Sequence, residues 1–278
     1  MSWIHPVQQE VAQSLQELVT HRVDTLRDPL LPTLLCFSHL RWNFVYQRPQ
    51  HLMTRFAGAY NVVFFEEPLH TDEIVPWLQI NPDDQGVQVL VPRLPTRLKG
   101  REVDDALRSL LNRYLTDLDV QDLVLWYYTP MSRVYSDHLQ ASVTVYDCMD
   151  ELSAFRGAPP ELVQRERELL ATADLVFTGG HSIWEAKRKL HSNAHAFPSS
   201  VDIAHFAVAR SHLKEPADQA AIAGPRFGFF GVIDERLDIE LLERIAELRP
   251  EWQFVMIGPV VKIDPATLPR RANIHYLG

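Results

Sequence analysis

Residues 34–60 read LLCFSHLRWNFVYQRPQHLMTRFAGAY, and this stretch predicts how the chain folds. It begins as a continuous apolar run, which is typical of a strand buried on both faces, and it ends with apolar residues at helical spacing. A strand that leads directly into a helix is the first half of a β-α-β unit, the building block of a doubly wound parallel sheet. Between these two elements the sequence places large polar and aromatic residues, among them His39, Arg41, Trp42 and Arg48.

The same alternation continues along the chain. Further apolar runs predict strands, and they read NVVFFEE, VQVLVP, DLVLWYYT, VTVYDCM, DLVFTGG and AHAFPS. Segments with apolar residues at helical spacing lie between them, and they read REVDDALRSLLNRYLTDL, PPELVQRERELLATA and HSIWEAKRKL. Strands that alternate with helices favour an α/β fold in which helices cover both faces of a parallel sheet.

A second series of strands and helices follows a change in composition near residue 207. The segment ARSHLKEPADQAAIAGP contains no strand pattern, and after it come RFGFFGV, WQFVMIG and NIHYLG. We therefore predict an N-terminal Rossmann-like domain over 1–206 with a helical extension over 1–30, a linker over 207–224, and a partial second Rossmann-like domain over 225–278. A parallel sheet of so few strands has an uncovered edge, so the second domain is expected to be incomplete.

Composition excludes several classes of function. The chain has 278 residues, a net charge of −9 and a pI near 5.7, and it shows no clustered run of Lys and Arg, which argues against a nucleic-acid partner. Cys36 and Cys148 lie far apart in apolar contexts, so we expect buried thiols in a reducing compartment. There is neither a leader pattern nor a long apolar segment, which predicts a soluble, cytoplasmic protein.

The polar residues after the first strand are candidates for ligand binding, because ligands of doubly wound sheets bind at the carboxyl ends of the strands. Arg41 and Arg48 offer forked donors for phosphate or carboxylate, His39 can exchange a proton, and Trp42 can pack on a sugar. The alternative is that Arg48 lies on the exposed face of an ordinary helix and that Trp42 closes the end of the sheet.

Two further strand ends carry candidate residues. Asp147, Asp150 and Glu151 follow the run VTVYDCM, and Asp150, which lies just past the strand, is the best placed to orient a hydroxyl or accept a proton. The alternative is that these carboxylates cap a turn. TGGHS follows the next strand, where paired glycines let the backbone approach a ligand beside His181, although Ser182 can equally be a helix N-cap.

Other signals for chemistry are weak or absent. The sequence has no Gly-x-Gly-x-x-Gly, Walker A, Gly-x-Ser-x-Gly or Cys-x-x-Cys motif, which argues against dinucleotide binding, P-loop hydrolysis and esterase chemistry. His191 and His195 are separated by a segment that does not form a helical face, and Asp117 and Asp119 close a helix. We expect neither a metal site nor a bound cofactor.

The order of several segments resembles that of two-domain GT-B glycosyltransferases related to the family 4 retaining enzymes. FVYQRPQHL resembles the first strand-helix unit of the branch that includes teichuronic-acid and other cell-envelope polysaccharide transferases. PSSVDIAHF stands where the group has an Asn-Gly-Val-Asp segment before its interdomain linker, and GFFGVIDERLD stands where its donor domain opens. FVMIGP and NIHYLG resemble the next two strands of that donor domain.

The resemblance implies a set of donor-binding residues in the second domain. Gly231 would let the donor diphosphate approach the backbone, Arg236 would neutralise it, and Gly258 would border the nucleotide. Val232 stands where many relatives have an arginine, so one of the two usual charges is missing, and Arg236 with Lys262 would compensate. The group's Glu-x7-Glu segment, which holds the donor sugar and ribose, would lie beyond residue 278.

The function that the resemblance implies is a hexosyltransferase, which moves a sugar from a nucleotide-sugar donor to a cell-envelope polysaccharide or glycolipid with retention. Asp150 and His39 would be catalytic, and Arg41, Trp42, Arg48 and His181 would bind the acceptor. Peripheral association with the cytoplasmic face of the membrane would fit such an acceptor. We expect the chain as given to be an incomplete enzyme. The alternatives are a non-catalytic sugar-nucleotide or polysaccharide binding module and a sugar-nucleotide epimerase.

Overall fold

The computed structural model describes residues 28–155, 157–211 and 213–278. The chain packs as two compact units that divide between Ser200 and Val201. The segment Ile203–Ala207, helix α7, falls in the second unit, and the domain boundaries expected at residues 206 and 224 stay predictions. Most of the helical extension expected over 1–30 lies outside the described residues.

Unit 1 contains a nine-stranded sheet in the order β3-β5-β2-β1-β6-β7-β8-β9, with β4 paired to β5. The strands are β1 (Thr33–Ser38), β2 (Asn61–Glu66), β3 (Leu69–Thr71), β4 (Trp77–Pro82), β5 (Val87–Pro95), β6 (Leu123–Tyr127), β7 (Val143–Cys148), β8 (Leu175–Thr178) and β9 (Ala194–Ala196). Every pairing is parallel except that of β4 with β5. The long apolar runs of the sequence are therefore the parallel strands.

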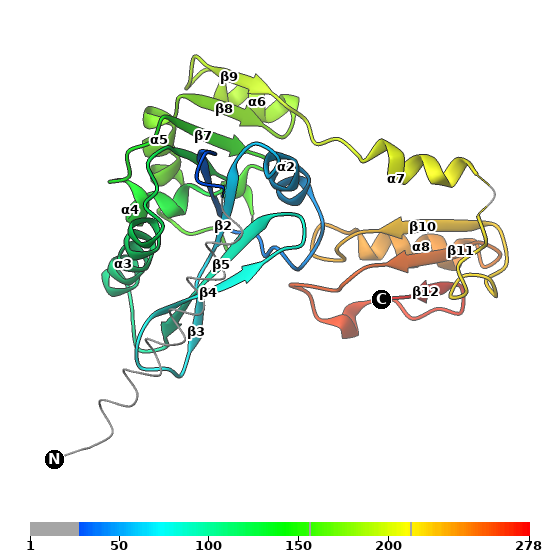
Figure 1. Cartoon of the computed structure of the whole chain (residues 1–278). Coiled ribbons are helices and arrows are strands. Elements are labelled where there is room, and N and C mark those ends of the chain that lie inside the picture. Colours follow the sequence, from blue (N-terminus) through cyan, green and yellow to red (C-terminus); the bar gives the residue numbers. More distant parts are fainter. Residues whose placement is uncertain (1–27, 156, 212) are drawn as a thin grey trace. The chain divides into compact units, whose positions relative to one another are not determined.

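Helices cover both faces of this sheet, as predicted. They are α2 (Arg48–Phe56), α3 (Arg101–Asp117), α4 (Arg133–Ser136), α5 (Leu162–Thr172) and α6 (His181–Lys187), with short 3-10 turns at Pro130–Ser132 and Leu152–Ala154. Figure 1 shows α3, α4 and α5 on one side of the sheet and α2 on the other. Leu111 of α3 and Leu169 of α5 pack in one apolar cluster, and Met53 of α2 packs in the second.

Two edge strands were missing from the sequence prediction. The side chains of β3 and β4 are exposed or half-exposed, so neither strand forms a continuous apolar run. β4 pairs with β5 through a tight turn in which Gly86 has a φ of 85°, a conformation that favours glycine. The sheet thus gains an antiparallel edge that alternation with helices could not predict.

Unit 2 contains a three-stranded parallel sheet in the order β10-β11-β12. Its elements are β10 (Arg226–Phe230), α8 (Ile239–Leu248), β11 (Gln253–Ile257) and β12 (Ile274–Tyr276), preceded by α7 and by 3-10 residues Val208–Arg210. Ala246 of α8 packs against Phe254, Met256 and Ile274, which forms a separate small core. The second β-α-β series predicted from the sequence is confirmed.

Candidate functional site

The carboxyl ends of β1, β6, β7 and β8 meet at one edge of the unit 1 sheet because these strands are parallel neighbours. The residues that follow these ends lie at this edge, and they include His39, Tyr128, Asp150 and Gly179. This is the edge at which doubly wound sheets bind ligands. It brings together chain segments that are far apart in the sequence.

His39 and Asp150 interact at this edge. Burial lowers the pKa of His39, while the Asp150 carboxylate and the Tyr128 backbone act in the opposite direction. The buried Nδ1 atom of His39 has no hydrogen-bond partner among the described residues. A neutral imidazole beside a carboxylate has the chemistry of a general base. The structure thus places the two predicted catalytic residues together, and their catalytic role stays a prediction.

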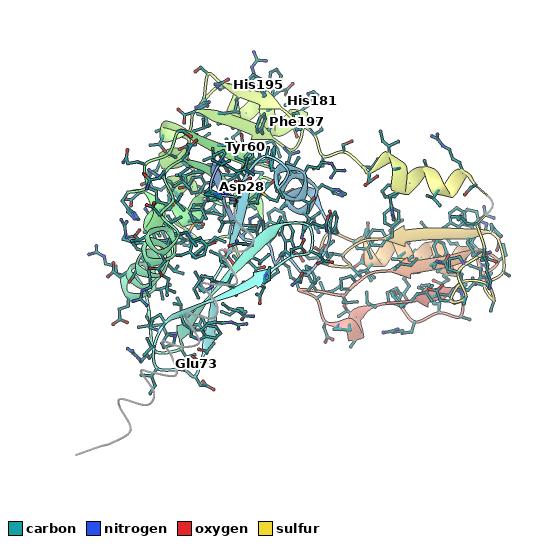
Figure 2. All side chains as sticks on the ribbon, viewed as in Figure 1. Asp28, Tyr60, Glu73, His181, His195 and Phe197 are labelled. Carbon is teal, nitrogen blue, oxygen red and sulfur yellow. The ribbon has the colours of Figure 1, made fainter. Side chains whose placement is uncertain are left out.

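The loop after β8 packs directly against the loop after β7. A Cβ atom built on Gly179 would lie 2.0 Å from the carbonyl oxygen of Met149, so only glycine fits there. This glycine therefore serves contact between the two loops. His181 and Ser182 follow at the start of α6 and are exposed, and Figure 2 labels His181 together with Phe197, which follows β9.

Arg48 forms an internal ion pair. Its Nη2 and Nε atoms lie 2.8 Å and 3.0 Å from the two carboxylate oxygens of Asp147, which is fully buried. The guanidinium also donates to the carbonyl oxygen of Phe197 and lies over its ring. Arg48 itself is buried, so the exposed helix face considered as the alternative is wrong. This guanidinium links α2, β7 and the segment after β9.

Arg41 and Trp42 brace the β1–α2 loop against β2. Arg41 Nη1 lies 2.8 Å from Glu66 Oε2, and the backbone N–H of Trp42 donates to Glu66 Oε1 at 2.7 Å. The buried Trp42 ring packs edge-on against Phe64, and its Nε1 donates to Asp83 at 3.0 Å. Trp42 thus closes the end of the sheet, the alternative considered from the sequence.

The same loop presents aromatic side chains to solvent. Phe44 and Tyr46 are both 53% exposed. The Tyr46 ring meets the His51 ring edge-on with 4.6 Å between centroids, which restricts its motion. Exposed aromatic rings on a braced loop offer an apolar surface for a ligand. Sequence reasoning missed Tyr46, although its place in a polar segment after a strand was a usable signal.

In unit 2, the loops after β10 and β11 touch through glycines. Gly231 and Gly258 have φ angles of 145° and 136°, and a Cβ on Gly258 would lie 2.0 Å from the carbonyl oxygen of Gly231. Side chains are therefore excluded between these strand ends. These glycines therefore serve the contact between the two loops, which lie where the resemblance predicts a donor diphosphate.

The predicted cations of unit 2 lie among carboxylates. Arg236 Nη2 donates to Asp234 at 2.7 Å, and Arg236 Nε donates to the same carboxylate. The hydrogen bonds from Arg236, together with the charge of Lys262, hold the pKa of Asp234 below its ordinary value. Lys262 Nζ lies 3.9 Å from Glu235 Oε1. The residues predicted from the resemblance are brought to one edge, and both cations have acidic neighbours there. No group of three or more metal-ligating residues occurs in the described part of the chain.

No family model matches the chain. A curated relative from Bacillus subtilis (strain 168), named as the teichuronic acid biosynthesis glycosyltransferase TuaH, is 25% identical over 181 residues, which cover 58% of this chain. The chain spans about 45% of that relative's length. Among solved structures, sucrose-phosphate synthase from Thermosynechococcus elongatus matches with a TM-score of 0.59 and 14% identity, over 89% of this chain and 70% of that one.

An α,α-trehalose-phosphate synthase (UDP-forming) from Burkholderia xenovorans, solved with glucose-6-phosphate, matches with a TM-score of 0.56 and 13% identity, over 88% of this chain and 74% of that one. The chain has the GT-B glycosyltransferase fold. In this GT-B chain, the edge with His39 and Asp150 belongs to the first α/β unit, and the edge with Gly231 and Gly258 belongs to the second.

Proposed function

We propose that this chain is part of a glycosyltransferase that moves a sugar from a nucleotide-sugar donor to a saccharide acceptor. The observation that carries the proposal is the GT-B fold, which extends over 89% of the chain. The alignment with the B. subtilis relative supports the same class, because that protein is named as a glycosyltransferase of teichuronic acid biosynthesis. The proposal assigns donor binding to unit 2 and acceptor binding to unit 1.

On the donor side, we place the diphosphate beside the loops that carry Gly231 and Gly258, whose backbones pack directly against each other. Arg236, whose side chain is 62% exposed, and Lys262 supply positive charge. The diphosphate must compete with Asp234 for the Arg236 guanidinium. We therefore expect nucleotide binding to be weak when the donor sugar makes no additional contacts.

On the acceptor side, His39 accepts the proton of the acceptor hydroxyl as that oxygen forms its bond to the anomeric carbon, while the bond from that carbon to the diphosphate breaks. Asp150 orients the hydroxyl and the imidazole. In this proposal, no bond between Asp150 and the sugar is required. Phe44 and Tyr46 offer their exposed rings to the apolar face of a saccharide.

The charges at the acceptor edge favour an acceptor recognised through hydroxyl groups. Arg41 pairs with Glu66, Arg48 pairs with Asp147, and Lys187 pairs with Glu166, so these cations already have carboxylate partners. A phosphate group on the acceptor would have to displace one of these carboxylates.

We further propose that the protein works in the cytoplasm and associates peripherally with the cytoplasmic face of the membrane. No helix in the described residues is long and apolar enough to cross a membrane. The β3–β4 loop supports the proposal, because Ile74 and Val75 are 78% and 68% exposed, and Figure 2 labels the neighbouring Glu73 there. Co-sedimentation with vesicles made of a neutral and an anionic phospholipid tests it. If the double variant Ile74→Ser/Val75→Ser no longer sediments with the vesicles, the β3–β4 loop makes the membrane contact. If the original chain does not sediment with them, the proposed membrane association is contradicted.

The proposed activity is tested by incubating the protein with a panel of UDP-, GDP- and dTDP-sugars, with and without neutral oligosaccharides, and analysing the products by mass spectrometry. Acceptor-dependent addition of one sugar supports the transferase. Interconversion of the nucleotide sugar without an acceptor supports the epimerase alternative. Binding without any product, in the chain and in a version extended to the length of the B. subtilis relative, supports a binding module and contradicts the transferase.

A further inference from the structure

A buried polar network lies beneath the loop that carries Asp150. Lys187, the last residue of α6, is 4% exposed, and Glu166 of α5 is 9% exposed. Lys187 Nζ lies 2.7 Å from the Glu166 carboxylate and 3.0 Å from Glu151 Oε2. Burying an ammonium group is costly, and it is tolerated here because two carboxylates surround it. Lys187 therefore ties the residue after Asp150 to two helices.

The residue that precedes the loop is tied to the same network. Cys148 Sγ lies 3.5 Å from the carbonyl oxygen of Asp150 and 3.8 Å from Glu166 Oε1. Burial raises the pKa of Cys148 to about 12, so the group remains a thiol that can donate. Glu166 also accepts a hydrogen bond of 2.8 Å from the Tyr146 hydroxyl. Both sides of the Met149–Asp150 segment are thus attached to Glu166, either directly or through Lys187.

The position of the Asp150 carboxylate depends on how the backbone of its loop is held. No described side chain donates a hydrogen bond to its carboxylate, so its position depends on where the loop is held. The close contact between Gly179 and Met149 fixes the loop on the β8 side. The network fixes it from α5 and α6. His39, whose pKa is lowered by burial and raised by the charge of the Asp150 carboxylate, follows the end of a different strand, β1.

We propose that Lys187 and Glu166 are positioning residues that hold the Asp150 loop so that its carboxylate faces His39. The catalytic importance of these two residues rests on the proposed function. Their role in holding the Asp150 loop does not. An ion pair that serves only to stabilise the fold would change stability without altering the interaction between Asp150 and His39. The two cases therefore differ in a measurable property of His39.

The test is an NMR titration of His39 in the original chain, Asp150→Asn, Lys187→Met and the double variant. Asp150→Asn removes a carboxylate that raises the pKa of His39, so this pKa should fall. Lys187→Met should lower it as well, because the loop is released, and should have no further effect when Asp150→Asn is present. Lys189→Met, which changes an exposed lysine outside the network, is the matched control and should leave His39 unchanged.

The proposal is overturned if folded Lys187→Met leaves the His39 pKa unchanged, or if it shifts that pKa equally with and without Asp150→Asn. Should Lys187→Met fail to fold, Glu151→Gln replaces it, because the Glu151 side chain is 38% exposed and its change leaves the ion pair between Lys187 and Glu166 in place. If the His39 pKa values follow the expected pattern but no sugar transfer is found, the proposed function is rejected and the positioning role is retained. In an active transferase, Lys187→Met should lower kcat while the Kd for the nucleotide stays unchanged.

Discussion

Arg48 and Asp147 lie 99 residues apart in the sequence and meet as a buried pair with bidentate geometry. Removing one partner leaves the other charge buried without compensation. We therefore expect Arg48→Met to destabilise unit 1 by about 3–5 kcal/mol. Urea unfolding monitored by tryptophan fluorescence measures this, and Arg55→Met, which changes an exposed arginine of the same helix, is the control. A stability equal to that of the control would contradict the pairing.

The buried imidazole of His39 predicts a dependence of stability on pH. Its pKa is lowered from an ordinary value near 6.5, chiefly by burial. The native state thus binds its proton less readily than the unfolded chain does, so this contribution to stability is present above about pH 6.5 and is lost as the pH falls through the folded pKa.

His39→Gln should therefore remove part of the loss of stability between neutral and mildly acidic pH, while His70→Gln, at an exposed histidine, should not. The free energy of unfolding from urea titrations across this range measures the difference. Identical pH profiles for His39→Gln and the original chain would contradict the account of His39.

These residues also show what the sequence could and could not reveal about the site. His39 and Asp150 were identified because each follows a strand, and parallel strands bring their ends together. Arg41, Trp42 and Arg48 were read as ligand contacts because their partners Glu66, Asp83 and Asp147 lie far away in the sequence. Lys187 and Glu166 were missed because a charged position on an amphipathic helix ordinarily faces solvent.

At the scale of elements, the sequence predicts the strands that are buried on both faces and the helices that cover them. The central strands and the helices that cover them have continuous apolar runs and helical spacing, and both patterns were recognised. β3 and β4 lack such a signal because they are exposed edge strands. Their pairing depends on a turn at Gly86, which composition alone did not locate.

The contact between the loops after β10 and β11 gives a prediction at this scale. Gly258→Ala would place a Cβ 2.0 Å from the Gly231 carbonyl oxygen at a φ of 136°, so we expect it to destabilise unit 2 by at least about 2 kcal/mol. Gly228→Ala is the matched control in β10, because no atom lies within 4 Å of the added Cβ. Hydrogen exchange of the β11 amides measures the effect, and equal protection in both variants would contradict it.

At the scale of the molecule, the two units have separate cores, and an exposed segment lies between α7 and β10. Nearly every described residue from 203 to 224 is exposed. Trypsin should therefore cleave first after Arg210 or Lys214 within residues 28–278, and the fragment containing the unit 1 sheet should resist further digestion. Mass spectrometry of the early fragments identifies the sites. Initial cleavage within the unit 1 sheet would contradict this division.

The central claim is that the second unit binds the nucleotide while the first provides His39 and Asp150. Its most direct test is an amide chemical-shift map recorded while UDP is titrated to millimolar concentration, at which weak binding is still detected. The account predicts shifts confined to the loops after β10 and β11, including Gly231, Arg236 and Gly258, and their loss in Arg236→Ala. Shifts centred on the His39 and Asp150 edge, or no shifts with any of UDP, GDP and dTDP, would contradict it.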